Sequence, residues 1–280
     1  MADVYFDQTH DQEQIVDLTL TIGAFRLDKF YASGTAFVVK PRIAITAKHV
    51  IDDFYKKFDG INFTKELNEG KLGTRKAGFN LSAVQHNKHA KNSSTYIWDI
   101  QHIYVCLLTD IVFLYLLPKN EETWGFCWKV SMIDFNPPKV GENIFGFGFH
   151  SSKSEFTYSD NTLTLQWSSI AATSKGQVVE VYNEKRDSVN LPFPCFQTNA
   201  RFDGGMSGGP VINERGYLCG VICSGIDTKD ENCDAVSYVA LLWPAMITHL
   251  STPHPICQSK RSYPALSLFN NNDISIGWEK

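Results

Sequence analysis

Short strand-forming segments separated by glycine and proline turns constrain the fold of this chain most strongly. They are rich in β-branched and aromatic residues, and few helical segments come between them. The expected strands are 18–25, 34–39, 42–46, 96–105, 111–117, 143–149, 163–169, 177–182, 209–212, 217–223 and 236–239. Helices are expected only over 50–58 and 240–250. This pattern predicts an all-β fold, a sandwich or barrel, rather than alternating strands and helices.

Two β-rich halves of similar size predict two packed barrels. We expect an N-terminal barrel over 1–120, a C-terminal barrel over 121–250 and a polar C-terminal tail over 251–280. Residues 56–95 are polar and form a long insertion loop. Two interpretations of this loop stay open: a solvated connection, or a lid or partner-docking loop.

Charge and hydropathy exclude two classes of partner. The 280 residues carry a net charge of −4, so no basic field attracts a nucleic acid. The most apolar stretch, 103–117, is shorter than the roughly 20 residues that span a bilayer, and Asp110 interrupts it. We therefore expect no membrane span. Residues 1–14 are acidic and polar, unlike a secretory signal, which predicts a cytoplasmic location.

The seven cysteines are expected to be reduced thiols, since their number is odd and no export signal precedes them. Cys219 and Cys223 would lie roughly 13 Å apart along one strand, too far to share a metal ion. The sequence predicts neither a metal nor another cofactor.

Three local motifs could carry chemistry. His49 follows an apolar strand and begins a short helix, which would hold an imidazole at a cleft, where it could accept a proton near neutral pH. Asp110 stands at the head of another apolar run, where a buried carboxylate needs a strong donor such as a ring N–H of His49. Ser207 lies among glycines, Gly205-Met206-Ser207-Gly208-Gly209, a composition typical of a tight turn. The backbone N–H groups of Gly205 and Ser207 could form an oxyanion hole.

The three motifs together are more specific than any one of them. They follow in the order His, Asp, Ser. Residues 45–50, 110–114 and 202–210 resemble the histidine, aspartate and serine motifs of trypsin-like peptidases. Residues 144–148 resemble the glycine-rich strand that opens the second barrel of that family. The chain is most similar to stand-alone bacterial trypsin-like and HtrA-like peptidase domains without a PDZ module.

The resemblance implies two six-stranded antiparallel barrels with a short C-terminal helix. It also implies a catalytic triad of His49, Asp110 and Ser207 in the cleft between the barrels, acting on a protein or peptide substrate. The strand ending at Cys223, Ser224 and Gly225 would bind the substrate, with Gly225 lining the primary specificity pocket.

Two positions depart from the pattern of secreted trypsins. Met206 replaces the aspartate that pairs with a new N-terminus after zymogen cleavage, so narrow specificity or an activator protein is expected instead. Arg201 stands where trypsins carry the acid of the specificity pocket, which argues against cleavage after Arg or Lys. The acidic residues at 227, 230, 231 and 234 could supply an acid from another direction or form an acidic surface loop.

Two other hypotheses compete with that of a serine endopeptidase. Gly205-x-Ser207-x-Gly209 also fits the nucleophile elbow of α/β-hydrolases, but the segment after Ser207 predicts a strand rather than the required helix. The stronger alternative is a catalytically silent binding module with a protease fold. Such proteins usually lack a triad member, whereas this chain has all three.

Overall fold

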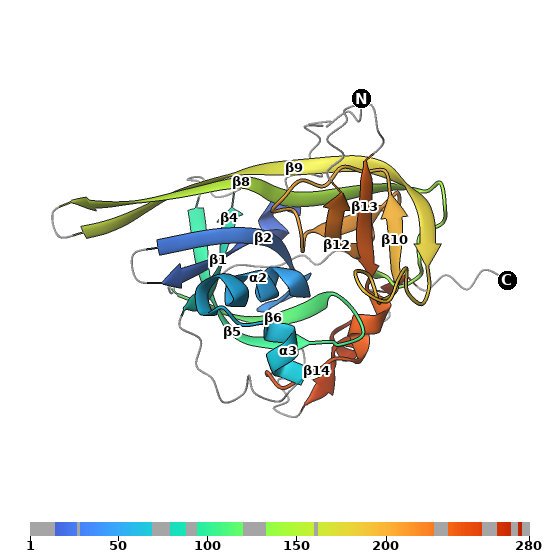
Figure 1. Cartoon of the computed structure of the whole chain (residues 1–280), viewed down its shortest axis with the longest axis horizontal. Coiled ribbons are helices and arrows are strands. Elements are labelled where there is room, and N and C mark those ends of the chain that lie inside the picture. The colour runs from blue at the N-terminus through green and yellow to red at the C-terminus, as the bar shows by residue number, and fades with distance from the viewer. Residues whose placement is uncertain are drawn as a thin grey trace.

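The computed structural model describes residues 15–26, 29–68, 79–87, 94–119, 133–159, 162–226, 235–253, 262–269 and 274–275. Strands dominate these residues (Figure 1). The strands are β1 (Thr19–Arg26), β2 (Lys29–Lys40), β3 (Ile43–Ala47), β4 (Asn80–Asn87), β5 (Ser94–Val105), β6 (Ile111–Pro118), β7 (Ile133–Asp134), β8 (Asn143–Ser159), β9 (Thr162–Tyr182), β10 (Cys195–Thr198), β11 (Pro210–Asn213), β12 (Leu218–Ile226), β13 (Val236–Leu241), β14 (His249–Leu250), β15 (Tyr263–Pro264) and β16 (Ile274–Ser275). The helices are α2 (Lys48–Asp59) and α3 (Phe63–Asn68), and η3 (Trp243–Ile247) and η4 (Ala265–Leu268) are 3-10 helices.

The strands form two six-stranded antiparallel rings, which confirms the predicted fold class. The first is a closed barrel in the order β1-β2-β3-β6-β5-β4. The second runs β8-β9-β10-β13-β12-β11 and closes because β11 pairs with both β8 and β12. If the strands of each ring are numbered from its first strand, both rings have the order 1-2-3-6-5-4. The two halves are therefore copies of one topology.

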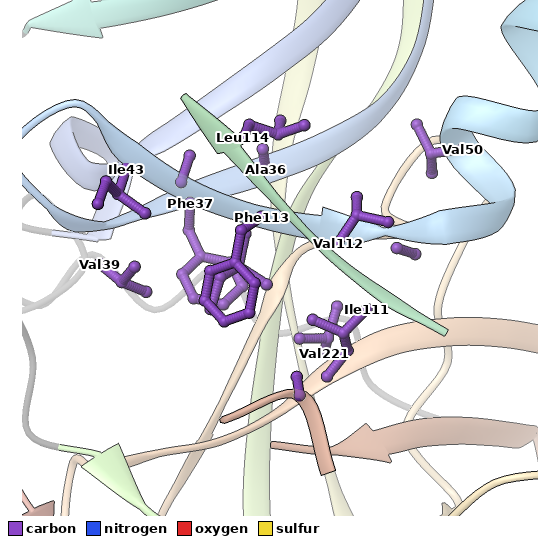
Figure 2. Packing of buried hydrophobic residues seen from close by; sticks show 14 of the residues in the cluster. Ala36, Phe37, Val39, Ile43, Val50, Ile111, Val112, Phe113, Leu114 and Val221 are labelled. Atoms are coloured by element: carbon purple, nitrogen blue, oxygen red, sulfur yellow. The ribbon is translucent and has the colours of Figure 1, made fainter. Parts of the chain in front are cut away.

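One apolar cluster fills the first barrel and continues to the second. Phe37 of β2 and Phe113 of β6 both belong to it (Figure 2). The same cluster contains Ile111 of β6 and Val221 of β12, a strand of the other barrel (Figure 2). Burying this apolar surface stabilises the barrels and their contact at once. The relative position of the two barrels is thus held by core packing.

The strands β8 and β9 form a long hairpin that runs along the first barrel and extends past it (Figure 1). Its register shifts between His150 and Lys153, where Ser151 has a φ of 52°. Beyond this bulge the Ser154 hydroxyl donates to the carbonyl oxygen of Phe30 in β2, at 3.0 Å. The hairpin therefore connects the two barrels outside the cleft.

The polar segment 56–95 is more than a loop. It contributes the end of α2, the short helix α3 and the barrel strand β4. Residues 69–78 and 88–93 of this segment lie outside the described residues.

The expected closing helix over 240–250 is present only as the five-residue η3. Its first residues end β13 instead, because Ala240 pairs with both Cys195 of β10 and Val221 of β12. In the expected polar tail, Tyr263, Ala265 and Leu268 are buried against the core. That part of the C-terminal stretch is therefore packed on the fold.

In the described ranges no helix is long and apolar enough to cross a membrane. Within the same ranges, no three His, Cys, Asp or Glu side chains gather in a group that could hold a metal ion.

Candidate active site

His49 is positioned by the junction between β3 and α2. The strand β3 is buried along its whole length, and α2 begins directly after it. Val50, Ile51 and Phe54 bury one face of α2 against the barrel. The imidazole in the first helical turn is consequently held by two packed elements at the mouth of the cleft.

Asp110, in the turn that precedes β6, completes the N-terminus of α2. Its backbone carbonyl accepts the Lys48 N–H at 2.8 Å, and its Oδ1 accepts the His49 N–H at 3.0 Å. These are two of the helix N–H groups that have no partner inside a helix, and a carboxylate is stabilised at a helix N-terminus. Asp110 therefore acts as the cap of this helix, since Ala47 provides no side-chain cap.

The second oxygen of Asp110 contacts the imidazole. His49 Nδ1 lies 2.6 Å from Asp110 Oδ2, and only 8% of the Asp110 side chain is exposed, against 37% for His49. A carboxylate accepts hydrogen bonds and cannot donate them when ionised, so Nδ1 carries the proton. This leaves Nε2 of a neutral His49 as the hydrogen-bond acceptor.

Burial and the surrounding charges oppose each other at His49. Burial of the imidazole lowers its pKa, but the charge of Asp110 and its hydrogen bond raise it. The carboxylates of Asp53 and Asp52 raise it further, so the pKa of His49 lies above its ordinary value of 6.5. The site thus favours the imidazolium more than an isolated histidine does.

Ser207 follows a tight turn between Asp203 and Met206. The Met206 N–H donates to the Asp203 carbonyl at 3.0 Å, and Gly205 has a φ of 101°. A turn with positive φ at its third residue requires glycine there. Gly208, with a φ of 84°, then directs its N–H to the Ile222 carbonyl of β12 at 2.8 Å. These bonds anchor both sides of Ser207 to the second barrel.

The N–H groups of Gly205 and Ser207 are available to a ligand. Among the hydrogen bonds of the described residues, neither group donates to a protein acceptor. The Met206 side chain points the other way, into the core cluster that contains Val211 and Ile222. Its sulfur accepts the Asp203 N–H at 3.4 Å. An apolar anchor therefore occupies the position where secreted trypsins carry an ion-paired aspartate.

A cleft of about 750 Å³ brings the predicted residues together. His49, Asp110 and Ser207 line it with Cys223, Ser224 and Gly225. Arg201 is not among its lining residues: 56% of this side chain is exposed, and its Nε donates to Asp203 Oδ1 at 2.9 Å. The acidic positions 227, 230, 231 and 234 lie outside the described residues.

Arg186 and Tyr238 are two of the lining residues that the sequence prediction did not include. The Arg186 guanidinium lies 4.7 Å from the centre of the Tyr238 ring, and both side chains line the cleft. They come from the connection after β9 and from β13, which no local motif links. Only the pairing of β10 with both strands brings these two segments together.

The residue after Gly34 has a role that the sequence did not suggest. Thr35 of β2 reaches from the first barrel to the turn that carries Ser207: its N–H donates to the Ser207 carbonyl and its hydroxyl to the Gly205 carbonyl, each at 2.8 Å. The sequence predicted Thr35 only as a residue of the strand 34–39. A buried threonine in a strand gives no sign of a partner more than a hundred residues away.

Comparisons with known proteins agree with this fold. A family model described as a trypsin-like peptidase domain matches residues 34–221. The chain superimposes on the inactive form of a mutant of Rv3671c from M. tuberculosis H37Rv with a TM-score of 0.50 and 14% identity, over 87% of this chain and 90% of that chain. It superimposes on Deg5 with a TM-score of 0.50 and 16% identity, over 82% of this chain and 90% of that chain. No curated protein sequence matches significantly. At these identities the structural likeness concerns the fold alone.

Proposed function

The chain belongs to the trypsin-like peptidase family and is a serine endopeptidase, and on that premise we propose that His49, Asp110 and Ser207 are its catalytic triad. The observation that supports this most is the 2.6 Å contact between His49 Nδ1 and Asp110 Oδ2 in the cleft that also contains Ser207. The alternative of an α/β-hydrolase conflicts with β11, a strand where that fold needs a helix.

In the proposed reaction, Ser207 Oγ attacks the carbonyl carbon of the scissile peptide bond. His49 Nε2 takes the hydroxyl proton, and Asp110 holds the ring in the tautomer that makes this transfer possible. The N–H groups of Gly205 and Ser207 donate to the oxygen that becomes negatively charged. The C–N bond then breaks, and His49 passes its proton to the departing amine.

Water completes the cycle by releasing the acyl group from Ser207. His49 again accepts a proton, this time from the water, and returns it to Ser207 Oγ. Every proton in this sequence moves between substrate, water, Ser207 and His49. The proposal accordingly involves no cofactor.

Labelling with a fluorophosphonate probe tests the triad. The wild-type protein is expected to become labelled, and Ser207→Ala and His49→Ala to remain unlabelled while their thermal unfolding midpoints stay close to that of the wild type. Labelling of Ser207→Ala would refute the assignment. An unlabelled wild type would favour a silent binding module or an enzyme that awaits an activator, and adding cell extract would then distinguish the two.

We further propose that the enzyme is restrained by narrow specificity, or by the need for an activator protein that docks on the segment 56–95 or on the C-terminal tail. The helix α3 of the segment 56–95 is tied to the helix that carries His49, because the Asp52 carboxylate accepts hydrogen bonds from the Thr64 N–H at 2.9 Å and the Thr64 hydroxyl at 2.7 Å. Replacing residues 70–77 with a glycine-serine linker would spare both α3 and β4. Unchanged activity and unchanged partner binding would count against this docking site.

A cytoplasmic location belongs to the same proposal. Cys106, Cys195, Cys219 and Cys223 are free and buried. Burial raises the pKa of the Cys195 thiol to about 11, which keeps it in the unreactive protonated form. Unpaired thiols are typical of a reducing compartment.

A further inference from the structure

Thr35 is a buried residue of the first barrel that contacts the nucleophile turn of the second. None of its surface is exposed, although its side chain is polar. A buried hydroxyl needs hydrogen-bond partners. The partners of Thr35 lie in both barrels.

The hydrogen bonds around Thr35 leave its hydroxyl a single orientation. The Phe149 N–H of β8 donates to Thr35 Oγ1 at 2.9 Å, so the hydroxyl proton points to the Gly205 carbonyl, 2.8 Å away. The backbone of Thr35 is held as well, since its carbonyl accepts the Thr46 hydroxyl at 2.6 Å and its N–H donates to the Ser207 carbonyl at 2.8 Å. The group that contacts Gly205 is therefore rigid.

The Gly205 carbonyl matters because of its place in the chain. It belongs to the peptide that links Gly205 to Met206, between the two N–H groups proposed as the oxyanion hole. Glycine accepts a wide range of backbone angles, so Gly205 alone does not prevent this peptide from rotating. A rotated peptide would change the direction of the neighbouring N–H groups, and oxyanion stabilisation depends on that direction.

We infer that Thr35 is a positioning residue: its hydroxyl holds the Gly205–Met206 peptide in the orientation that keeps the oxyanion hole open. This inference rests on the proposed function. It also makes the geometry of the hole depend on the contact between the barrels, because the donor belongs to one barrel and the peptide to the other. The backbones meet closely here, since a methyl group added to Gly208 would overlap the Thr35 carbonyl oxygen.

Three variants test the role of the hydroxyl. Thr35→Val keeps the shape and removes the donor, Thr35→Ser keeps the donor, and Thr248→Val is the control. Thr248 is also buried, but its hydroxyl has no partner among the described residues and it does not line the cleft. The readouts are the second-order rate of fluorophosphonate labelling, the downfield proton resonance of the His49–Asp110 hydrogen bond, and amide hydrogen exchange over residues 203–208.

We expect Thr35→Val to lower the labelling rate by about 10- to 100-fold, since misplacing a reacting group by 1 Å can cost about 100-fold. Amide exchange over 203–208 should speed up, while the downfield resonance stays at its wild-type position. Thr35→Ser and Thr248→Val should label within about twofold of the wild type, below the effect of a lost oxyanion donor.

If Thr35→Val were labelled and exchanged its amides at the wild-type rates, the inference would be overturned. So would an equal loss in Thr248→Val, or loss of the downfield resonance, because either would mean general loosening. Amide exchange is independent of catalysis and tests Thr35 even in a protein that the probe does not label. Failure of the triad proposal, by contrast, would show as an unlabelled wild type or as labelling of Ser207→Ala.

Discussion

The buried side chain of Met206 offers a test of how this enzyme holds its oxyanion turn without a zymogen ion pair. Only 1% of Met206 is exposed, and it packs in the core of the second barrel. Removing a buried methionine side chain typically costs about 2–5 kcal/mol of folding free energy. Met206→Ala should lose an amount in this range, whereas Met206→Leu conserves volume and should lose less than about 1.5 kcal/mol.

The same substitution should affect catalysis, because Met206 lies between Gly205 and Ser207. With the anchor gone the turn gains alternative conformations, and we expect fluorophosphonate labelling of Met206→Ala to slow by about tenfold or more, since orientation of the reacting groups governs the rate. Denaturant unfolding measures the stability loss and labelling kinetics measure the rate. Met206→Leu is the matched control, expected to stay near the wild type in labelling.

Met206→Asp distinguishes an apolar anchor from an ion-paired one. In secreted trypsins an aspartate at this place has a cation to pair with, whereas here it would enter an apolar cluster. A buried carboxylate without a partner costs several kcal/mol, so this variant should be less stable than Met206→Ala. If Met206→Asp were as stable and as active as the wild type, or if Met206→Ala behaved like Met206→Leu in both assays, the apolar-anchor reasoning would be wrong.

Two further predictions concern charge and backbone. Asp53→Asn removes a charge that raises the pKa of His49, so neutral His49 should persist to lower pH. In a plot of labelling rate against pH, the fall on the acid side should therefore move to lower pH. An unchanged pH profile would contradict this. Gly208→Ala should destabilise the fold by about 3 kcal/mol or more in denaturant unfolding, because it combines backbone strain with overlap against Thr35. The control is Gly216→Ala, where φ is also positive but no atom lies within 4 Å, so about 1–2 kcal/mol of strain is expected; equal losses would refute the role of the inter-barrel contact.

The sequence predicted most barrel strands but missed β4 and β10. Alternation of apolar and polar residues is the usual sign of a strand, and β4 lacks it because Ser82 and Gln85 are buried beside Leu81 and Ala83. Gln85 is accommodated because its Oε1 accepts the Trp98 indole N–H of β5 at 2.9 Å. A polar side chain whose partner comes from another strand conceals the strand from any local pattern.

The length of the β8–β9 hairpin was also beyond the local pattern. Strands were expected at 143–149, 163–169 and 177–182, whereas the structure has one strand of 17 residues and one of 21. The residues from Ser151 to Glu155 are polar, and no strand was expected over them. They form a strand because each strand of the hairpin satisfies the backbone groups of the other, even where the hairpin extends past the barrel.

The sequence by itself determined the barrel topology class and the three motifs around His49, Asp110 and Ser207, because each motif depends only on local composition: a strand followed by a helix, a carboxylate before an apolar run, a serine among glycines. Only the tertiary structure decided how they act together. It placed Asp110 at the N-terminus of the helix that carries His49, left Arg201 outside the cleft lining, and set Thr35 against the peptide beside Ser207. The contacts of Asp110 and Thr35 join residues from different elements or barrels, and burial of the shared core, not the order of residues along the chain, holds them at hydrogen-bonding distance.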